Sequence, residues 1–313
     1  MSITATSAFT GTARNNIIMD LVFGAQTIQA GLLHVIPRKN DLIYLPIVKT
    51  DADQLQNRVE TPDPADSATS EYSEKVIDPQ DMLWFQLFNP EVFEHVWQQF
   101  WPGGRLAAQT MNPQILSAVI QTINKSLNNQ LDRNIWQGDT DLDPASPLRF
   151  FDGFVKLFNE PGSGVQFTDP NTGITSDNVI GEMEKLLEAC PSEVKNLGSP
   201  KIITSHDVAE KYQRAARSLD FKGTNITEAI QARFGGFPVV PVGGMPADTL
   251  VMADASLSPD SNLLAGTWLP EEKDNLIVDR YRPESELWFI KTTFRMGVQF
   301  AKGEEIAVNQ PAP

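Results

Sequence analysis

One long acidic segment most restricts the folds open to this chain. Residues 51–74 contain no lysine, a single arginine (Arg58) and two prolines. Strand-like runs flank the middle of this segment, at residues 42–48 and 72–77. A stretch so poor in apolar side chains cannot pack a core of its own. We therefore predict a hairpin arm that needs a neighbouring molecule to lie on, which indicates assembly rather than catalysis.

The charge balance limits what the chain can bind. It has 313 residues, with 25 Lys+Arg against 40 Asp+Glu and a net charge of −15. A protein that binds nucleic acid by neutralising phosphates normally carries a basic patch, and this sequence contains no basic run. Its length suffices for about two domains. The excess negative charge favours free subunits that stay apart until specific contacts form.

The single cysteine and the amino-terminal residues indicate in which cellular compartment the protein is made. One cysteine, Cys190, excludes an intrachain disulfide and fits synthesis in a reducing compartment. Residues 1–12 lack the basic and apolar regions of a signal peptide. Residues 21–36 are too short and too polar to span a membrane. We expect a soluble protein made in the cytoplasm.

A long helix is the clearest regular element. Asn112, Pro113 and Gln114 form a helix start, and apolar residues then recur at helical spacing. Gly138 is expected to be the glycine that stands just beyond the helix end. We predict a helix over residues 113–137 that lies half-buried across a sheet. The opposite face is expected to be solvated, and comprises Gln121, Asn124, Lys125, Asn128, Asn129, Asp132 and Arg133.

Shorter elements surround this helix. A helix is expected within residues 15–28, and Asn89-Pro90-Glu91 marks the start of another. The second half of the chain is expected to alternate helices and short strands. The expected elements are helices over 178–189 and from Ser205 or Asp207 to 219, buried strands over 201–204, 237–242 and 250–253, and a long alternating strand over 288–300.

The residues capable of catalysis do not form the pattern of an active site. His34, His95 and His206 lie far apart in the sequence, and none has the HExxH spacing of a zinc site. His206 stands at a helix start, which favours a structural residue of the helix cap over a catalytic base. Cys190 ends a helix before a proline, which favours a buried and unreactive thiol.

Three further patterns resemble functional sites but have simpler interpretations. Glu184 and Glu188 have the spacing of a solvated helix face. The glycine pairs at 235–236 and 243–244 lack the Lys-Ser/Thr and the helix of a phosphate loop, so they predict turns. Residues 139–143 resemble the start of a calcium loop but lack its later glycine and glutamate. We therefore predict no cofactor, no metal and no enzymatic activity.

The order of the expected elements resembles that of the major capsid proteins of tailed bacteriophages, which have the Hong Kong ninety-seven-type fold. Phe151-Asp152-Gly153 looks like the "FDG" segment that follows the long helix in these proteins. Residues 199–212 look like a strand and helix of the axial domain, and residues 236–250 like the "G-x-P-V" strand with the hairpin after it. The resemblance covers residues 41–307. Two departures are the missing charged scaffolding segment at the start and the missing lysine in the arm, which leaves covalent crosslinking through the arm unsupported.

This resemblance implies an α+β architecture with an N-terminal arm, an extended hairpin arm (the E-loop), a peripheral domain with a long spine helix, and an axial α/β domain. The implied bounds are 1–40 for the N-terminal arm, 41–82 for the hairpin arm, 83–168 and 262–313 for the peripheral domain with its spine helix at 113–137, and 169–261 for the axial domain.

The same resemblance implies a function. The chain is expected to form pentamers and hexamers of an icosahedral virion shell that encloses double-stranded DNA without binding specific sequences. The expected partners are further copies of the chain, a portal, and separate scaffolding or decoration proteins, with no membrane. Synthesis and assembly are expected in the cytoplasm of a bacterial host.

An acidic arm predicts basic partners on the neighbouring subunit. The candidate contact residues are Asp51, Asp53, Arg58, Glu60, Asp63, Asp66, Glu71, Arg105, Arg280, Arg282 and Arg295. Three alternatives stay open. An encapsulin-like nanocompartment shell would carry a pocket for a cargo peptide and hold no DNA. Another virion protein, such as a tail-tube or decoration subunit, would not need the long helix, and a soluble α/β enzyme would need a polar pocket.

Overall fold

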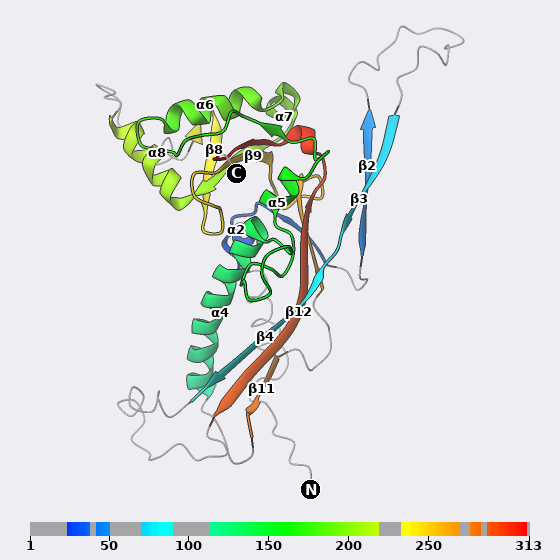
Figure 1. Ribbon diagram of the computed structural model, residues 1–313, viewed down its shortest axis with the longest axis vertical. Helices are drawn as coiled ribbons and strands as arrows, with labels where there is room; N and C mark the ends of the chain where they lie inside the picture. Colours follow the sequence, from blue (N-terminus) through cyan, green and yellow to red (C-terminus); the bar gives the residue numbers. More distant parts are fainter. Residues whose placement is uncertain are drawn as a thin grey trace.

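The computed structural model describes residues 24–37, 42–50, 70–89, 113–218, 233–268, 276–282 and 287–311. Two sheets with their helices form the body, and a two-stranded arm projects from it (Figure 1). The acidic middle of the arm at residues 51–69 and the helix expected after Asn89 lie outside the described residues, as does His95. Of the helix expected within residues 15–28, the described part shows a short turn, α2 (Gln26–Gln29).

A five-stranded sheet forms one part of the body. Its strands are β1 (His34–Pro37), β4 (Gln80–Phe88), β10 (Leu263–Trp268), β11 (Leu276–Arg280) and β12 (Trp288–Phe300). The long strand β12 pairs with β4 along one edge, and with β10 and β11 along the other. Its alternation is the predicted one, because Phe294, Met296 and Phe300 are all buried. The strand β4 was not anticipated from the sequence.

The spine helix α4 spans Pro113–Gln137, as predicted. Its buried residues Leu127, Leu131 and Ile135 belong to the same core as Met82 of β4 and Phe294 of β12. Figure 1 shows the helix running beside these strands. The prediction of a half-buried helix across a sheet is therefore confirmed.

The glycine after this helix is required by crowding, not by a left-handed backbone. Gly138 is absent from the glycines with positive φ. A Cβ at this position would lie 2.2 Å from the carbonyl oxygen of Phe151. The amide of Gly153 donates to the carbonyl of Gly138 at 2.8 Å. The predicted place of Gly138 just beyond the helix end is confirmed, and the role of this glycine is to let the segment at 151–153 pass close by.

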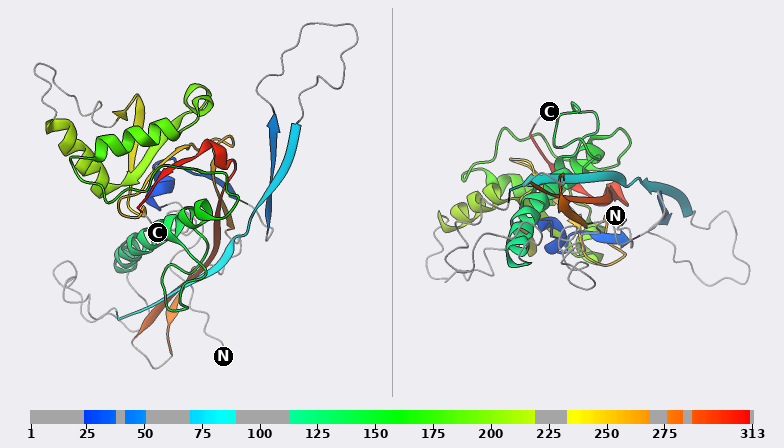
Figure 2. Two further views of the ribbon diagram at one scale, coloured as in Figure 1. Left: turned by 45° about the horizontal axis from the view of Figure 1, so that its top comes forward. Right: turned by 90° about the horizontal axis from the view of Figure 1, so that it is seen from below.

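A six-stranded sheet with three covering helices forms the other part of the body. Its strand order is β5 (Gln166–Phe167), β13 (Ala307–Asn309), β9 (Leu250–Asp254), β6 (Pro200–Ser205), β8 (Phe237–Val242) and β7 (Arg233–Phe234). The helices are α6 (Val179–Ala189), α7 (Ser192–Leu197) and α8 (His206–Ser218), which Figure 2 shows from two further sides. The amide of Val208 donates to Ser205 Oγ at 3.4 Å, so Ser205 caps α8.

Two expectations for this sheet need correction. The strands β8 and β9 do not form a hairpin, because β6 lies between them, parallel to β8 and antiparallel to β9. The hairpin is instead between β7 and β8, around Gly235 and Gly236, which both have positive φ. The expected bounds place residues 307–309 in the peripheral domain, whereas β13 pairs with β9 and β5 of the six-stranded sheet.

The projecting arm is the predicted hairpin. Its strands β2 (Ile43–Thr50) and β3 (Ser70–Ile77) pair antiparallel from Ile43 opposite Ile77 to Thr50 opposite Ser70. The base is fixed to the body, because Ile43 and Ile77 are buried with Leu264 of β10. Both views in Figure 2 show the arm extending away from the body.

A short helix α5 (Phe154–Asn159) and the 3-10 turn η2 (Gly303–Glu305) complete the described elements. The "FDG" segment leads into α5. Phe151 is buried in the core, and Asp152 Oδ1 accepts hydrogen bonds from the amide and hydroxyl of Thr140, both at 2.8 Å. The segment Phe151-Asp152-Gly153 therefore holds the loop after the spine helix against the body.

Candidate assembly surfaces

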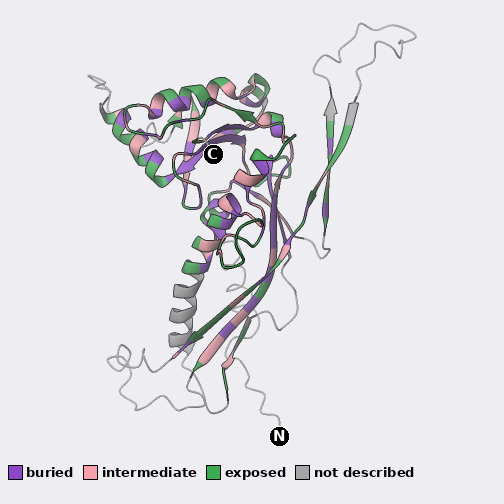
Figure 3. Cartoon of the chain, in the orientation of Figure 1, coloured by how far each residue is buried: buried purple, intermediate pink, exposed green. Residues whose placement is uncertain are grey.

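The outward face of the arm is apolar although it is exposed. Residues opposite each other on β2 and β3 share a face, which places Tyr44 beside Val76 and Val48 beside Tyr72. All four are exposed, with Tyr72 at 80% and Tyr44 at 53%. Figure 3 shows this contrast between the arm and the buried strands of the body. An exposed apolar surface of this kind marks an interaction site.

A second exposed apolar surface lies on the five-stranded sheet, on the face away from α4. From β4 it takes Leu83, Phe85 and Leu87, all exposed. The register places Phe85 opposite Lys291 of β12, and the ring of Phe85 stacks on that of Phe289 at 5.6 Å. These residues alternate with Met82 and Trp84, which face the core. The strand is therefore apolar on both faces.

The predicted contact residues fall in different places. Glu71 lies on β3 opposite Lys49. Arg295 pairs with Asp81 of β4, and its hydrogen bond lowers the pKa of that carboxyl group. The guanidinium of Arg280 lies 5.8 Å from the ring of Trp288, and that of Arg282 lies 5.4 Å from the ring of Tyr281. The candidates outside the described residues are Asp51, Asp53, Arg58, Glu60, Asp63, Asp66 and Arg105.

A buried carboxylate joins the spine helix to two other segments. Asp132 is 2% exposed, so its expected place on a solvated face is wrong. Its oxygens accept hydrogen bonds from the amide of Thr27 at 2.8 Å, the hydroxyl of Thr27 at 2.5 Å and the amide of Gly244 at 2.7 Å. The indole of Trp136 donates to the same hydroxyl at 2.8 Å. This cluster, the Asp132 joint, fixes α2 and the loop after β8 to α4.

Lys156 neutralises negative charge in the loop at residues 139–143, whose sequence resembles the start of a calcium loop. Lys156 Nζ lies 2.6 Å from Asp139, 2.7 Å from Asp141 and 2.9 Å from Asp152. Burial lowers the pKa of Lys156, but the three carboxylates outweigh it and raise the pKa. The hydrogen bond from Lys156 lowers the pKa of Asp139. The described residues contain no group of three His, Cys, Asp or Glu side chains placed to hold a metal.

The other candidates for chemistry have structural surroundings. Cys190 is buried, which raises the pKa of its thiol and opposes reactivity. His206 begins α8 and hydrogen-bonds the side chain of Gln26. Glu184 and Glu188 are exposed on α6, as predicted. Within the described part of the chain, no helix is both long enough and apolar enough to cross a membrane.

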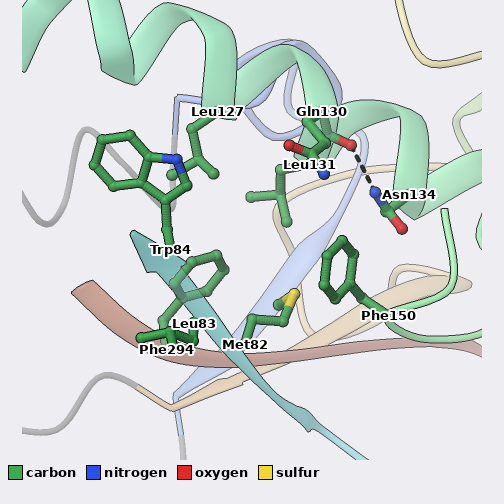
Figure 4. A pocket seen from close by; sticks show the side chains of 9 residues that line it. All are labelled: Met82, Leu83, Trp84, Leu127, Gln130, Leu131, Asn134, Phe150 and Phe294. Carbon is green, nitrogen blue, oxygen red and sulfur yellow. Dashed lines mark hydrogen bonds between the residues drawn. The ribbon is translucent and has the colours of Figure 1, made fainter. Parts of the chain in front are cut away.

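A small pocket of about 40 Å³ lies between α4 and the sheet (Figure 4). Most of its lining is apolar and includes Leu127, Leu131, Trp84 and Phe294. The side-chain amide nitrogen of Asn134 donates to the carbonyls of Gln130 at 2.9 Å and Pro147 at 3.0 Å, whereas its Oδ1 is buried without a hydrogen-bond partner in the described part of the chain. Gln130 is the other polar residue of a lining that is otherwise apolar.

Comparison with known proteins shows the fold. No protein-family model matches the chain, and no curated protein matches it. The capsid of an empty GTA particle matches over 99% of this chain and 100% of that chain, with a TM-score of 0.61 and 13% identity. The satellite phage P4 procapsid matches over 98% and 93%, with a TM-score of 0.59 and 10% identity. A virus-like particle from Pyrococcus furiosus matches over 94% and 96%, with a TM-score of 0.53 and 9% identity.

These matches cover 94–99% of this chain. They define a class of protein, the shell-forming capsid proteins, whose fold this chain shares. The fold is that of the major capsid proteins of tailed phages, the Hong Kong ninety-seven type, and the resemblance in the order of elements is thereby confirmed.

Proposed function

We propose that this chain is the major capsid protein of a tailed bacteriophage and self-assembles into an icosahedral shell around double-stranded DNA. The observation that carries the proposal is the match over the whole length of a GTA capsid chain. The projecting arm and the two exposed apolar faces support it, because a lone monomer gains nothing by exposing them.

The mechanism is physical. The arm of one subunit lies on the next subunit and buries apolar surface that the monomer leaves exposed. Such a contact joins two different surfaces and closes into rings when the rotation allows it. Rings of five and six subunits then tile a shell. The six-stranded sheet with α6 and α8 forms the axial domain around each ring axis, and the five-stranded sheet with α4 forms the peripheral domain.

The net charge of the chain fits a shell protein that encloses DNA better than a protein that binds DNA directly. With a net charge of −15, the chain has no means to neutralise many phosphates. DNA is held by the closed shell, without sequence-specific contacts. The further partners are a portal, for DNA entry, and separate scaffolding or decoration proteins. Synthesis and assembly take place in the cytoplasm of the bacterial host.

A second candidate function is that of a nanocompartment shell protein. We consider it because one of the matched solved structures is a virus-like particle from Pyrococcus furiosus. The two functions differ in what the particle contains. A phage capsid holds nuclease-protected DNA, whereas a nanocompartment holds a protein cargo bound to its inner wall.

Negative-stain microscopy of the purified chain tests the shared claim. The void fraction from size-exclusion chromatography should contain closed shells, open sheets or rings, formed by the chain alone or with a co-expressed scaffolding protein. A chain that stays monomeric or dimeric at high concentration, whatever the salt or partner, would contradict the proposal. Nuclease-protected DNA in particles from the native source would then decide for the phage over the nanocompartment.

A further inference from the structure

We propose that the outward face of the arm packs face to face on the outer face of the five-stranded sheet of a second copy of this chain, with Glu74 against Lys291. This inference rests on the proposed function and assigns the residues of its contact between subunits. The expected contacts between the acidic residues of the arm and the arginines stay a separate prediction.

The arm presents three rows of paired side chains with one charge in the middle. The rows are Tyr44 with Val76, Pro46 with Glu74, and Val48 with Tyr72. Glu74 is exposed, and the four residues of the outer rows are exposed and lack charge. A partner surface must therefore supply apolar contacts at both ends and a cation at the centre.

The sheet presents a matching arrangement with the opposite charge. Its rows are Leu83 with Thr293, Phe85 with Lys291 and Ile277, and Leu87 with Phe289 and Asp279. Lys291 is half-buried between the apolar side chains of the central row. The central row of each surface thus carries one charge, negative on the arm and positive on the sheet, and Asp279 at the β11 edge of an outer row is a further charge of the sheet surface.

The dimensions of the two surfaces agree. Each spans five residues along its strand, 44–48 on the arm and 83–87 on β4, or about 13 Å at about 3.3 Å per residue. Two sheets pack face to face through such surfaces. A charge buried on packing is costly without an opposite charge, so the central pair also sets the register.

The charges of the proposed contact are available. Neither Glu74 nor Lys291 forms an ion pair within the described part of the chain. Arg295, which was expected to meet the arm, is instead paired with Asp81 of its own sheet. Lys291 is therefore the better partner for the arm than Arg295.

The arm cannot reach the sheet of its own chain. Two residues, Asp78 and Pro79, separate β3 from β4. The arm therefore leaves the body at the end where β4 begins and extends away from the body (Figures 1 and 2). A second copy must supply the contact.

Charge reversal tests the proposal. We expect Glu74→Lys and Lys291→Glu each to lower the yield of shells by at least about tenfold, because like charges would then meet. The double variant should restore assembly. Glu184→Lys, on the exposed face of α6, is the matched control and should assemble normally. Circular dichroism of the monomers checks that each variant folds.

Crosslinking keeps the test decisive if a variant fails to fold. Glu74→Cys together with Lys291→Cys, treated with a short bis-maleimide, should give a ladder of covalent multimers from shells. Glu184→Cys with Lys291→Cys should not, and the native Cys190 is buried and does not compete. Normal wild-type shells without a ladder and without rescue by the double variant would overturn this contact and leave the proposed function standing. A wild-type chain that forms no particle would overturn both.

Discussion

The Asp132 joint gives a prediction whose size follows from the structure. Asp132→Ala removes the acceptor of hydrogen bonds from two amides, those of Thr27 and Gly244, and from the hydroxyl of Thr27. Each buried donor left without a partner costs about 1–3 kcal/mol. Two amides without partners should together lower the free energy of local opening by about 3 kcal/mol, which raises the local opening equilibrium constant by roughly 100-fold.

Hydrogen exchange measures this opening at the two amides themselves. In Asp132→Ala the amides of Thr27 and Gly244 should exchange roughly 100-fold faster than in the wild type, whereas the amides of β12 should exchange at the same rate as before. Asp132→Asn keeps the shape and one acceptor oxygen, so its effect should be smaller. Asp260→Ala, at an exposed carboxylate, is the matched control. Unchanged protection of both amides in Asp132→Ala would refute the account of this joint.

Three further predictions concern other parts of the chain. Lys156 lowers the pKa of Asp139, so this stabilisation is complete at neutral pH and is lost as the pH falls below about 4. With exchange rates referred to the intrinsic rate at each pH, the amides of residues 139–152 should be less protected at pH 3 than at pH 7, and less protected at pH 7 in Lys156→Met than in the wild type. Tyr72→Ser should leave the melting temperature of the monomer unchanged, because Tyr72 is exposed, yet lower the yield of shells; a lower melting temperature would show that Tyr72 packs within its own chain. Cys190 should react with a thiol reagent only when the chain unfolds, and fast labelling of the native protein would contradict its burial.

The elements predicted well from the sequence have a single buried face. The spine helix has a proline at its start and regular apolar spacing, and α4 matches the predicted bounds of 113–137. The strand β12 alternates over 13 residues, and the hairpin arm is flanked by two strand-like runs. The helix and β12 each pack one face on the body, and the arm has its base buried against β10, so the local pattern carries the information.

The parts that were missed depend on contacts distant in sequence. The strand β4 has apolar residues on both faces, because Met82 and Trp84 face the core while Leu83 and Phe85 are exposed, so alternation gave no signal. Asp132 lies on the polar side of its helix, but a donor 105 residues earlier and another 112 residues later bury it. The exposed apolar run in β4, directly after an arm, was the available sign of a second contact surface.

A reconstruction of the assembled particle by cryo-electron microscopy tests the central claim most directly. We expect a closed shell in which β2 and β3 of each subunit cross the sheet face of β4 and β12 of a neighbour, with Glu74 beside Lys291. A shell whose arms contact no neighbouring subunit, or a chain that yields no particle to reconstruct, would contradict it.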